Sequence, residues 1–296
     1  MPPPDCRRLT CQRRNPIMTD KNLRALYGLK YNPFLPNLPT DALWVAPEAE
    51  TFAHRVQTMI SQGGFAMITG DPGQGKSKTL QWIAQRLSKM PDITVGVMER
   101  PQSHLADFYR ELGELFGVGL TPLNRYGSFT ALRAKWKAHC LSTLARPILL
   151  IDEAQEVSSV CLTELRLLQS VCFDSDSLLF TILCGDGRLP DRFRTPELLP
   201  LGSRIRARLH MAPLSPEQLQ EYLSFALEQA GHPQLMTPEL IQTLAAHSLN
   251  NLRVLNHTAA EMLAAAAERN LPRLDESLYL ELFSPAPSKP RRNKAS

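Results

Sequence analysis

The sequence has no apolar run long enough to cross a bilayer, and its first residues lack the apolar core of a secretory signal peptide. It also carries little net charge, because 33 basic and 29 acidic residues leave an excess of only +4. The first absence excludes a protein with membrane-spanning helices, and the second gives only a mild indication of an anionic partner. We therefore expect a soluble, cytoplasmic protein.

Paired metal-binding or redox cysteines are also absent. None of the six cysteines forms a C-x-x-C pair, and none has a histidine partner at the spacing of a metal site. Several of them lie in apolar segments, where a free cysteine behaves as a small hydrophobic residue. This usage argues against a cysteine-based metal site and favours a reducing compartment.

The composition is that of a folded chain. Of the 296 residues, 43% are hydrophobic and 21% are charged, and this length suggests one large or two modest domains. The two ends differ from the rest, since residues 1–17 are rich in proline and arginine and residues 285–296 are rich in lysine and arginine. We predict a disordered basic leader over 1–17 and a disordered basic tail over 285–296, with nucleic-acid contact as the sharper alternative.

The central feature of the chain is a glycine-rich loop between an expected strand and an expected helix. The apolar residues 65–68 predict a buried strand, and the pattern from residue 79 onward predicts a helix. Between them, G-x-x-x-x-G-K-S is a phosphate-loop motif in the context that it requires. We assign nucleotide binding to nine consecutive residues: Gly70, Asp71, Pro72, Gly73, Gln74, Gly75, Lys76, Ser77 and Lys78.

The residue types of this loop suit a polyphosphate. Gly70, Gly73 and Gly75 let the main chain curl so that several N–H groups point at one phosphate. The loop then opens onto a helix N-terminus, whose free N–H groups favour anions. Lys76 is expected to reach the β- and γ-phosphates of ATP, and the Ser77 hydroxyl to bind Mg²⁺.

A second motif lies where the apolar segment 147–151 ends in two acidic residues. Asp152 is predicted to hold Mg²⁺, directly or through water, and Glu153 to polarise the attacking water. Acidic residues are common in turns after strands. Their distance downstream of the lysine loop leaves room for a further βα unit, and this favours the catalytic interpretation.

The next expected strand, 178–184, ends close to Asp186. A polar group at the tip of the strand beside the acidic one would lie near the γ-phosphate and position water. Asp186 is our first candidate for that role and Thr181 the second, with an ordinary turn as the alternative. The other elements expected before residue 212 are a strand at 93–98 and helices at 48–61, 105–116, 128–144 and 161–171.

Three arginines, Arg204, Arg206 and Arg208, alternate along the chain, which places them on one face if the segment is extended. One interpretation is a solvated face. The other is that an arginine is offered to a γ-phosphate bound by a neighbouring copy, where it neutralises charge during hydrolysis.

After residue 214 the pattern changes to helices alone, at 216–230, 238–248 and 251–269. Ser215 and Thr237 each precede a proline at the first helical position, which indicates a helix start. Arg253, near the start of the third helix, either reaches back over the nucleotide or lies on the surface.

A loop over residues 121–127 mixes an arginine, a tyrosine and amides, and the helix that we expect after it is capped by Ser128. The loop is either an ordinary surface loop or a finger that touches a nucleic-acid backbone. For the second interpretation, the candidate phosphate contacts are Arg125, Arg133 and Lys135.

Together these motifs resemble the AAA+ ATPases. The stretches GDPGQGKS, LLIDEAQE and GSRIRARL, with YGL and NPF near the start, are similar to the ExeA-like ATPases encoded beside transposases and to the TniB, IstB and phage Mu B proteins. The resemblance covers residues 18–284. It implies that Arg204 is the arginine finger and Arg253 the second sensor, and it places Asn250 where the family usually has glycine.

The resemblance implies an α/β AAA+ domain with a parallel sheet over 18–212 and a helical lid over 213–284. The implied activity is ATP hydrolysis by a homo-oligomer, a ring or a filament, that assembles on double-stranded DNA and recruits or stimulates a cognate transposase. Three alternatives stay open: a secretion-linked ATPase of the ExeA type, a nucleotide-gated scaffold with little hydrolysis, and a helicase loader.

Overall fold

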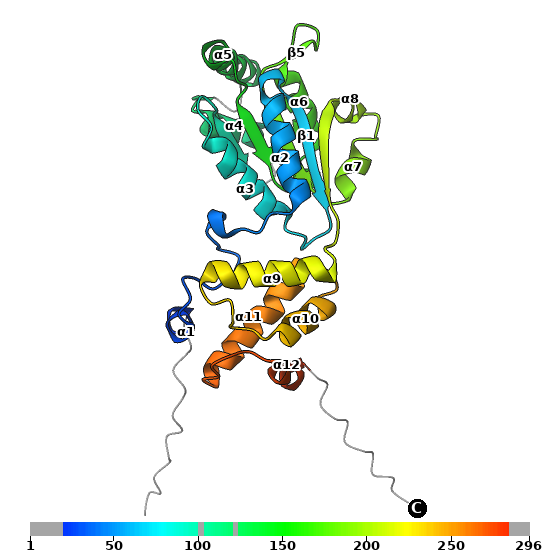
Figure 1. The fold of residues 1–296 in the computed structure, drawn as a ribbon. Coiled ribbons are helices and arrows are strands. Elements are labelled where there is room, and N and C mark those ends of the chain that lie inside the picture. Colours follow the sequence, from blue (N-terminus) through cyan, green and yellow to red (C-terminus); the bar gives the residue numbers. More distant parts are fainter. Residues whose placement is uncertain (1–19, 100–103, 121–123, 284–296) are drawn as a thin grey trace, which may run out of the picture.

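The computed structural model describes residues 20–99, 104–120 and 124–283. Figure 1 shows two units, an α/β unit and a bundle of helices below it. The predicted basic leader and basic tail lie outside the described residues, as do residues 121–123 of the predicted loop.

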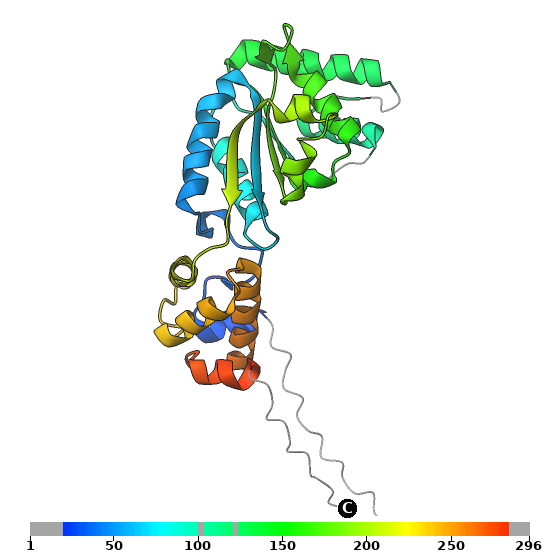
Figure 2. The same ribbon diagram turned by 90° about the vertical axis from the view of Figure 1, so that its right-hand side faces the viewer.

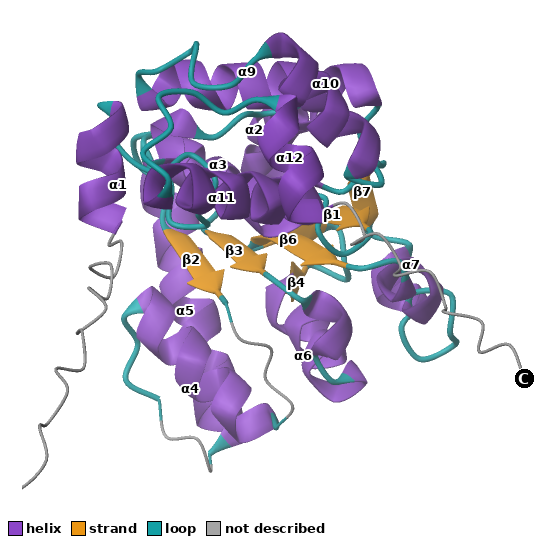
Figure 3. Ribbon diagram, turned by 90° about the horizontal axis from the view of Figure 1, so that it is seen from below, coloured by secondary structure: helices purple, strands orange, loops and turns teal. Residues whose placement is uncertain are grey.

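The α/β unit is built on a five-stranded parallel sheet. Its strands lie in the order β2-β3-β6-β1-β7, seen side by side in Figure 3. Every residue of β3 is buried, as expected of a parallel strand covered on both faces. The predicted parallel sheet is thereby confirmed. The strands are β1 (Gly64–Gly70), β2 (Val95–Met98), β3 (Ile148–Ile151), β6 (Phe180–Gly185) and β7 (Ile205–Met211).

Helices cover both faces of this sheet, because successive side chains of a strand point to opposite sides. In β3, Ile148 and Leu150 pack on one side with α2 and α3, whereas Leu149 and Ile151 pack on the other with α4, α5 and α6. The result is a three-layer arrangement, which Figures 2 and 3 show from two further sides. The helices are α2 (Pro47–Met59), α3 (Lys76–Ser88), α4 (Leu105–Phe116), α5 (Arg125–Thr143) and α6 (Ser159–Gln169).

Short elements complete the α/β unit. β4 and β5 form a two-stranded antiparallel hairpin between α6 and β6, so α6 ends two residues before the predicted end at residue 171. The short elements are η1 (Thr40–Ala42), η2 (Ile60–Gln62), η3 (Ala154–Glu156), β4 (Ser170–Val171), β5 (Asp176–Ser177), α7 (Arg188–Arg192) and α8 (Leu199–Gly202).

Helix α5 begins earlier than the sequence pattern predicted. The Asn124 side chain accepts a hydrogen bond from the Gly127 N–H at 2.9 Å and caps the helix, which starts at Arg125. Ser128, the predicted cap, instead lies inside the helix and is buried. Asparagine caps a helix as well as serine does, and Asn124, the earlier of the two residues, is the cap in this structure.

The second unit is a helical bundle whose first two starts match the prediction. Ser215 caps α9 in a capping box with Gln218, and Thr237 caps α10 by accepting the Leu240 N–H at 3.2 Å. Within the described ranges, every helix is too short or too polar to cross a membrane. The bundle contains α9 (Pro216–Ala230), α10 (Pro238–His247), α11 (Leu252–Glu268) and α12 (Glu276–Phe283).

The segment before the α/β unit packs on the helical bundle. Helix α1 (Asp20–Tyr27) lies beside the bundle in Figure 1, and Leu23 and Phe34 share its apolar core. The Tyr27 hydroxyl donates to the Leu271 carbonyl at 3.0 Å. The structure therefore places this segment with the helical unit, whereas we expected it in the α/β domain over 18–212. An apolar helix face in a sequence does not say which domain will cover it.

A buried carboxylate that pairs with an exposed arginine joins three helices of the α/β unit. The Glu164 side chain is only 3% exposed and accepts hydrogen bonds from Arg125 Nε at 2.8 Å and Nη2 at 2.5 Å, and from the Tyr109 hydroxyl at 2.6 Å. Burial raises the pKa of Glu164, but the hydrogen bonds from Arg125 and Tyr109 outweigh burial and hold the pKa below its ordinary value.

This ion pair predicts an acid-sensitive contribution to stability. Because the folded-state pKa of Glu164 lies below the unfolded value, the contribution is complete above about pH 4.3 and is lost as the pH falls through the folded-state pKa. We expect Arg125→Met to lower the free energy of unfolding by about 2 kcal/mol at pH 7 and by less at pH 3, measured by urea unfolding. Arg110→Met, which removes an exposed pair with Asp107, is the control. Equal losses at both pH values would contradict the prediction.

Candidate functional site

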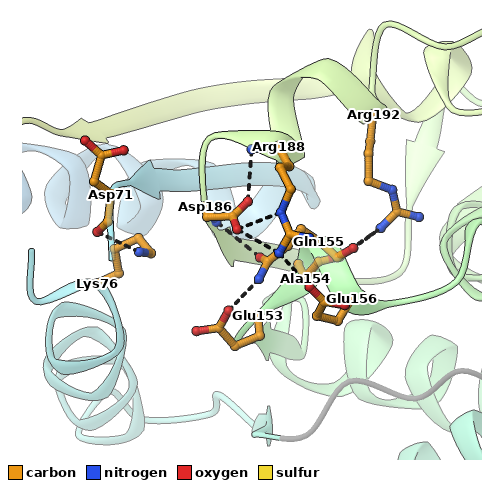
Figure 4. Close-up of polar contacts among 9 residues, drawn as sticks. All are labelled: Asp71, Lys76, Glu153, Ala154, Gln155, Glu156, Asp186, Arg188 and Arg192. Carbon is orange, nitrogen blue, oxygen red and sulfur yellow. Dashed lines mark hydrogen bonds and ion pairs between the residues drawn. The ribbon is translucent and has the colours of Figure 1, made fainter. Parts of the chain in front are cut away.

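The phosphate loop follows β1 and leads directly into α3, as the sequence predicted. Gly73 and Gly75 have φ values of 90° and 87°, in the left-handed region that glycine adopts without strain. The Lys76 side chain is buried and its Nζ donates to the Asp71 carbonyl at 3.0 Å, a contact drawn in Figure 4. An ammonium group at the mouth of a glycine loop is therefore in place to meet a phosphate.

The carboxyl ends of three parallel strands bring the predicted site residues together. β6 lies between β1 and β3, with Thr69 opposite Gly185 and Ile151 opposite Leu183. Asp186, just after β6, therefore lies between the phosphate loop and the acidic residues after β3. Figure 4 shows this arrangement along the edge of the sheet.

The acidic pair after β3 lies close to the lysine of the loop. Glu153 has a φ of 49°, and its N–H donates to Asp152 Oδ1 at 3.0 Å. Burial raises the pKa of the neighbouring Cys184 thiol, the Asp152 carboxylate raises it further, and the Lys76 ammonium opposes both. Asp152, Glu153 and Lys76 therefore all act on Cys184, near the end of β6.

Asp186 is paired within the protein. Its carboxylate accepts hydrogen bonds from the Arg188 N–H and Nε, both at 2.9 Å. Burial raises the pKa of Asp186, but the hydrogen bonds from Arg188 outweigh burial and hold the pKa below its ordinary value. Thr181, our second candidate for this role, lies inside β6, is fully buried and bonds to Gln169 at 3.4 Å. Of the two residues, only Asp186 lines the cavity that adjoins the phosphate loop.

Gln155 belongs to this site, although the sequence pattern did not predict it. Its Nε2 donates to Glu153 Oε2 at 2.5 Å, and its Oε1 accepts the Asp186 N–H at 3.1 Å. Arg188 spans the same region by pairing with Glu156 at 2.6 Å (Figure 4). The only sequence signal for Gln155 is its place two residues after the acidic pair.

The helical bundle touches the phosphate loop directly. Gln74 Nε2 donates to the Asn250 carbonyl at 3.1 Å, Asn251 Nδ2 to the Pro72 carbonyl at 3.0 Å, and the Arg253 N–H to the Gly73 carbonyl at 3.2 Å. A Cβ on Gly73 would overlap the Asn251 side chain. The phosphate loop and the start of α11 are therefore hydrogen-bonded and closely packed.

Asn250 stands at the position where the family resemblance leads us to expect glycine, and it adopts a backbone conformation that is typical of glycine. Its φ is 57°, in the left-handed region, where asparagine is tolerated better than most residues other than glycine. Asn251 then caps α11, its Oδ1 accepting the Arg253 N–H at 2.9 Å and the Val254 N–H at 3.4 Å.

A cavity of about 810 Å³ lies between the two units. The phosphate loop, Glu153, Asp186 and Arg253 line its polar part. Its apolar part is lined by residues that include Phe34, Leu35, Pro36, Trp44 and Tyr222. The volume lies within the range of about 300–1,000 Å³ that is typical of small-molecule sites, and an apolar end beside a phosphate loop fits a nucleotide.

The donor set also fits a hard cation. Ser77 supplies a hydroxyl and Asp152 a carboxylate, and Mg²⁺ is usually held by one or two protein oxygens together with water and substrate phosphates. Among the described residues, no group of three or more histidine, cysteine, aspartate or glutamate side chains could hold a metal ion alone.

Arg204 lies at the other end of the sheet. It precedes β7, whose first residue is opposite Phe65 and whose last is opposite Gly70. At about 3.3 Å per residue, seven residues place Arg204 about 20 Å from the phosphate loop. Its Nη2 bonds to Asp174 Oδ2 at 2.5 Å, and its Nη1 to the Pro200 carbonyl. Arg204 therefore lies out of reach of a phosphate bound in its own cavity.

Two of the three candidate DNA contacts have internal partners. Arg125 pairs with Glu164, and Arg133 Nη1 donates to the carbonyls of Leu168 at 2.9 Å and Ser170 at 2.6 Å. Lys135 is exposed on α5. The prediction of phosphate contacts therefore depends chiefly on Lys135.

Part of the chain is similar to known proteins. Residues 57–193 match a family described as AAA domain. The chain is 30% identical over 248 residues to general secretion pathway protein A of Aeromonas hydrophila. That match covers 82% of this chain but 44% of the relative, so the chain spans less than half of that protein's length.

Solved structures of AAA+ proteins superpose on most of the chain. The ORC2 protein of Aeropyrum pernix gives a TM-score of 0.68 at 17% identity, covering 84% of this chain and 70% of that one. Drosophila ORC bound to DNA gives 0.63 at 15% identity, with 97% and 72% covered. Domain III of DnaA from Thermotoga maritima gives 0.57 at 18% identity, with 84% and 96% covered. The chain has the AAA+ P-loop NTPase fold, which confirms the predicted fold class.

The contact between loop and bundle predicts a double effect for Asn251→Ala. The variant removes the cap of α11, which costs about 1 kcal/mol of stability, and it removes a bond to the phosphate loop, which should weaken nucleotide binding. Urea unfolding and titration with a non-hydrolysable ATP analogue measure the two effects. Thr237→Ala is the matched control, because it removes the cap of α10 away from the loop. The prediction is wrong if both variants bind the analogue equally well.

Proposed function

We propose that this chain binds ATP with Mg²⁺ in the cavity between its two units and hydrolyses the ATP to ADP and phosphate. The observation that carries the proposal is the meeting of Lys76, Asp152 and Glu153 at one edge of the sheet, beside a glycine loop and an apolar pocket. Each of these residue types has a separate role in phosphoryl transfer, so their presence together favours that reaction.

Each residue has a stated role in this proposal. The main-chain N–H groups of residues 70–78 other than Pro72 hold the phosphates, and Lys76 exchanges the Asp71 carbonyl for phosphate oxygens. Ser77 and Asp152 hold Mg²⁺, which supplies neutralising charge when bound. Glu153 orients and polarises the attacking water. Asp186, at the tip of β6, helps to position that water, and Arg253 lies over the nucleotide from the lid.

We further propose that a neighbouring copy completes the site. Arg204 lies about 20 Å from its own phosphate loop, so it can stabilise only a γ-phosphate that another copy holds. It is paired with Asp174 at 2.5 Å, and assembly must break this pair before Arg204 can act. ATP-bound copies would therefore form a homo-oligomer, and loss of the γ-phosphate would release them.

The partner of this assembly is proposed to be double-stranded DNA, with a transposase recruited to it. The support is the motif resemblance to transposition ATPases and the fold shared with ORC, which has been solved bound to DNA in Drosophila. In this proposal ATP assembles the protein on target DNA, and hydrolysis resets it. Lys135 on α5 is the candidate phosphate contact.

A secretion-linked ATPase is the second candidate. It is favoured by the 30% identity to general secretion pathway protein A of Aeromonas hydrophila. The two candidates differ in what raises ATP turnover: duplex DNA in the first, and a component of an export system in the second. A nucleotide-gated scaffold would bind ATP and show little turnover with either.

Turnover of ATP with and without duplex DNA is the experiment that tests the first candidate. We expect DNA to stimulate the wild-type chain. Lys76→Ala should abolish both ATP binding and assembly on DNA. Glu153→Gln should bind ATP normally and lower kcat by at least about 10²-fold, leaving the ATP-bound assembly trapped. Normal turnover by Glu153→Gln would remove this residue from the mechanism, and turnover indifferent to DNA would favour the other candidates.

Mixing two inactive variants tests the contribution of Arg204. Arg204→Ala keeps the cavity and lacks the arginine, whereas Lys76→Ala keeps the arginine and cannot bind ATP. Each should be inactive alone, and an equimolar mixture should recover part of the turnover, because Lys76→Ala supplies the missing arginine. Arg206→Ala is the control, since Arg206 bonds to Gln62 at 2.5 Å on the same edge of the sheet and should not affect turnover. A mixture without activity would contradict a role in trans.

A further inference from the structure

The side chain of Gln155 joins two parts of the site that belong to different strands. Its amide nitrogen donates to the carboxylate of Glu153 after β3, and its amide oxygen accepts the backbone N–H of Asp186 after β6. Gln155 is 7% exposed, and both of its hydrogen bonds are partly buried. A single buried amide therefore sets the distance between Glu153 and the tip of β6 (Figure 4).

Gln155 itself is held firmly. Its carbonyl accepts a hydrogen bond from Arg192 Nη1 at 2.5 Å, and Arg192 also reaches the Ser159 hydroxyl at 3.3 Å. The glycine at position 185 leaves the space that the amide oxygen occupies, since a Cβ on Gly185 would overlap Gln155 Oε1. The chain thus provides both the anchor for the Gln155 backbone and the room for its side chain.

A second link parallels the first. Arg188 pairs with Glu156 at 2.6 Å and with Asp186 at 2.8 Å, and the pair with Glu156 joins the turn after β3 to the start of α7. Gln155 and Arg188 therefore both connect the turn after β3 to the segment after β6.

We propose that Gln155 is a positioning residue, which holds the Glu153 carboxylate in the orientation needed to polarise water and ties that orientation to the tip of β6. The inference rests on the proposed role of Glu153 and adds a residue to which no role has been given. Gln155 acts through Glu153 and leaves nucleotide binding to the phosphate loop.

Two substitutions separate the two hydrogen bonds of Gln155. Gln155→Met has a similar length and removes both bonds. Gln155→Glu keeps an oxygen that can accept from the Asp186 N–H, removes the donor to Glu153, and places a second negative charge beside it. We expect both variants to lower kcat by about 10²-fold, because a misplaced catalytic group costs that much, and to leave the affinity for ATP within about threefold of wild type.

Amide hydrogen exchange of the nucleotide-free chain provides a readout other than activity. The Asp186 N–H should stay protected in wild type and in Gln155→Glu, and exchange faster in Gln155→Met. Gln169→Met is the matched control: Gln169 is also buried and bonds to β6, through Thr181 inside the strand, and its loss should leave kcat unchanged.

The combination with Glu153→Gln decides whether Gln155 acts through Glu153. In a Glu153→Gln background, Gln155→Met should cause no further fall in kcat, because the group that it orients is already gone. A further tenfold loss, or a Gln155→Glu variant that turns over within about twofold of wild type, would overturn the inference. If Glu153→Gln alone turns over normally, the proposed base fails instead, and the two failures are distinguished.

Discussion

The structure depends on the contact between the phosphate loop and the start of α11. The main chain of the loop accepts hydrogen bonds from Asn251 and Arg253, and the Gln74 side chain donates to Asn250. These bonds fix the lid against the loop at the floor of the cavity. A change in the conformation of the loop would disturb these hydrogen bonds to the start of α11, a helix that shares the apolar core of the bundle.

The opposite wall of the cavity is a polar network at the ends of β3 and β6. Buried polar groups are costly unless they are paired, and here Gln155, Arg188 and Arg192 supply the partners for the turn after β3. Paired in this way, the network gives Glu153 a defined place relative to the loop.

One cation proposed for the reaction is distant from this cavity. Arg204 precedes the edge strand β7, at the amino end of the sheet, while the phosphate loop lies at the carboxyl end. A parallel sheet places all the carboxyl ends together, so a residue before a strand cannot reach the site of its own chain. A catalytic contribution from Arg204 would therefore require a second copy, and within one chain the arginine is paired with Asp174.

The sequence by itself determined the local motifs: the glycine loop between β1 and α3, the acidic pair after β3, the parallel strands and the capped starts of α9 and α10. These depend on neighbouring residues, and neighbours in sequence are visible in a pattern. Only the tertiary structure decided that α1 packs on the bundle, that Asn251 meets Pro72, and that Gln155 joins Glu153 to Asp186. These contacts bring together residues from different elements, and no periodicity or spacing records which surfaces will meet.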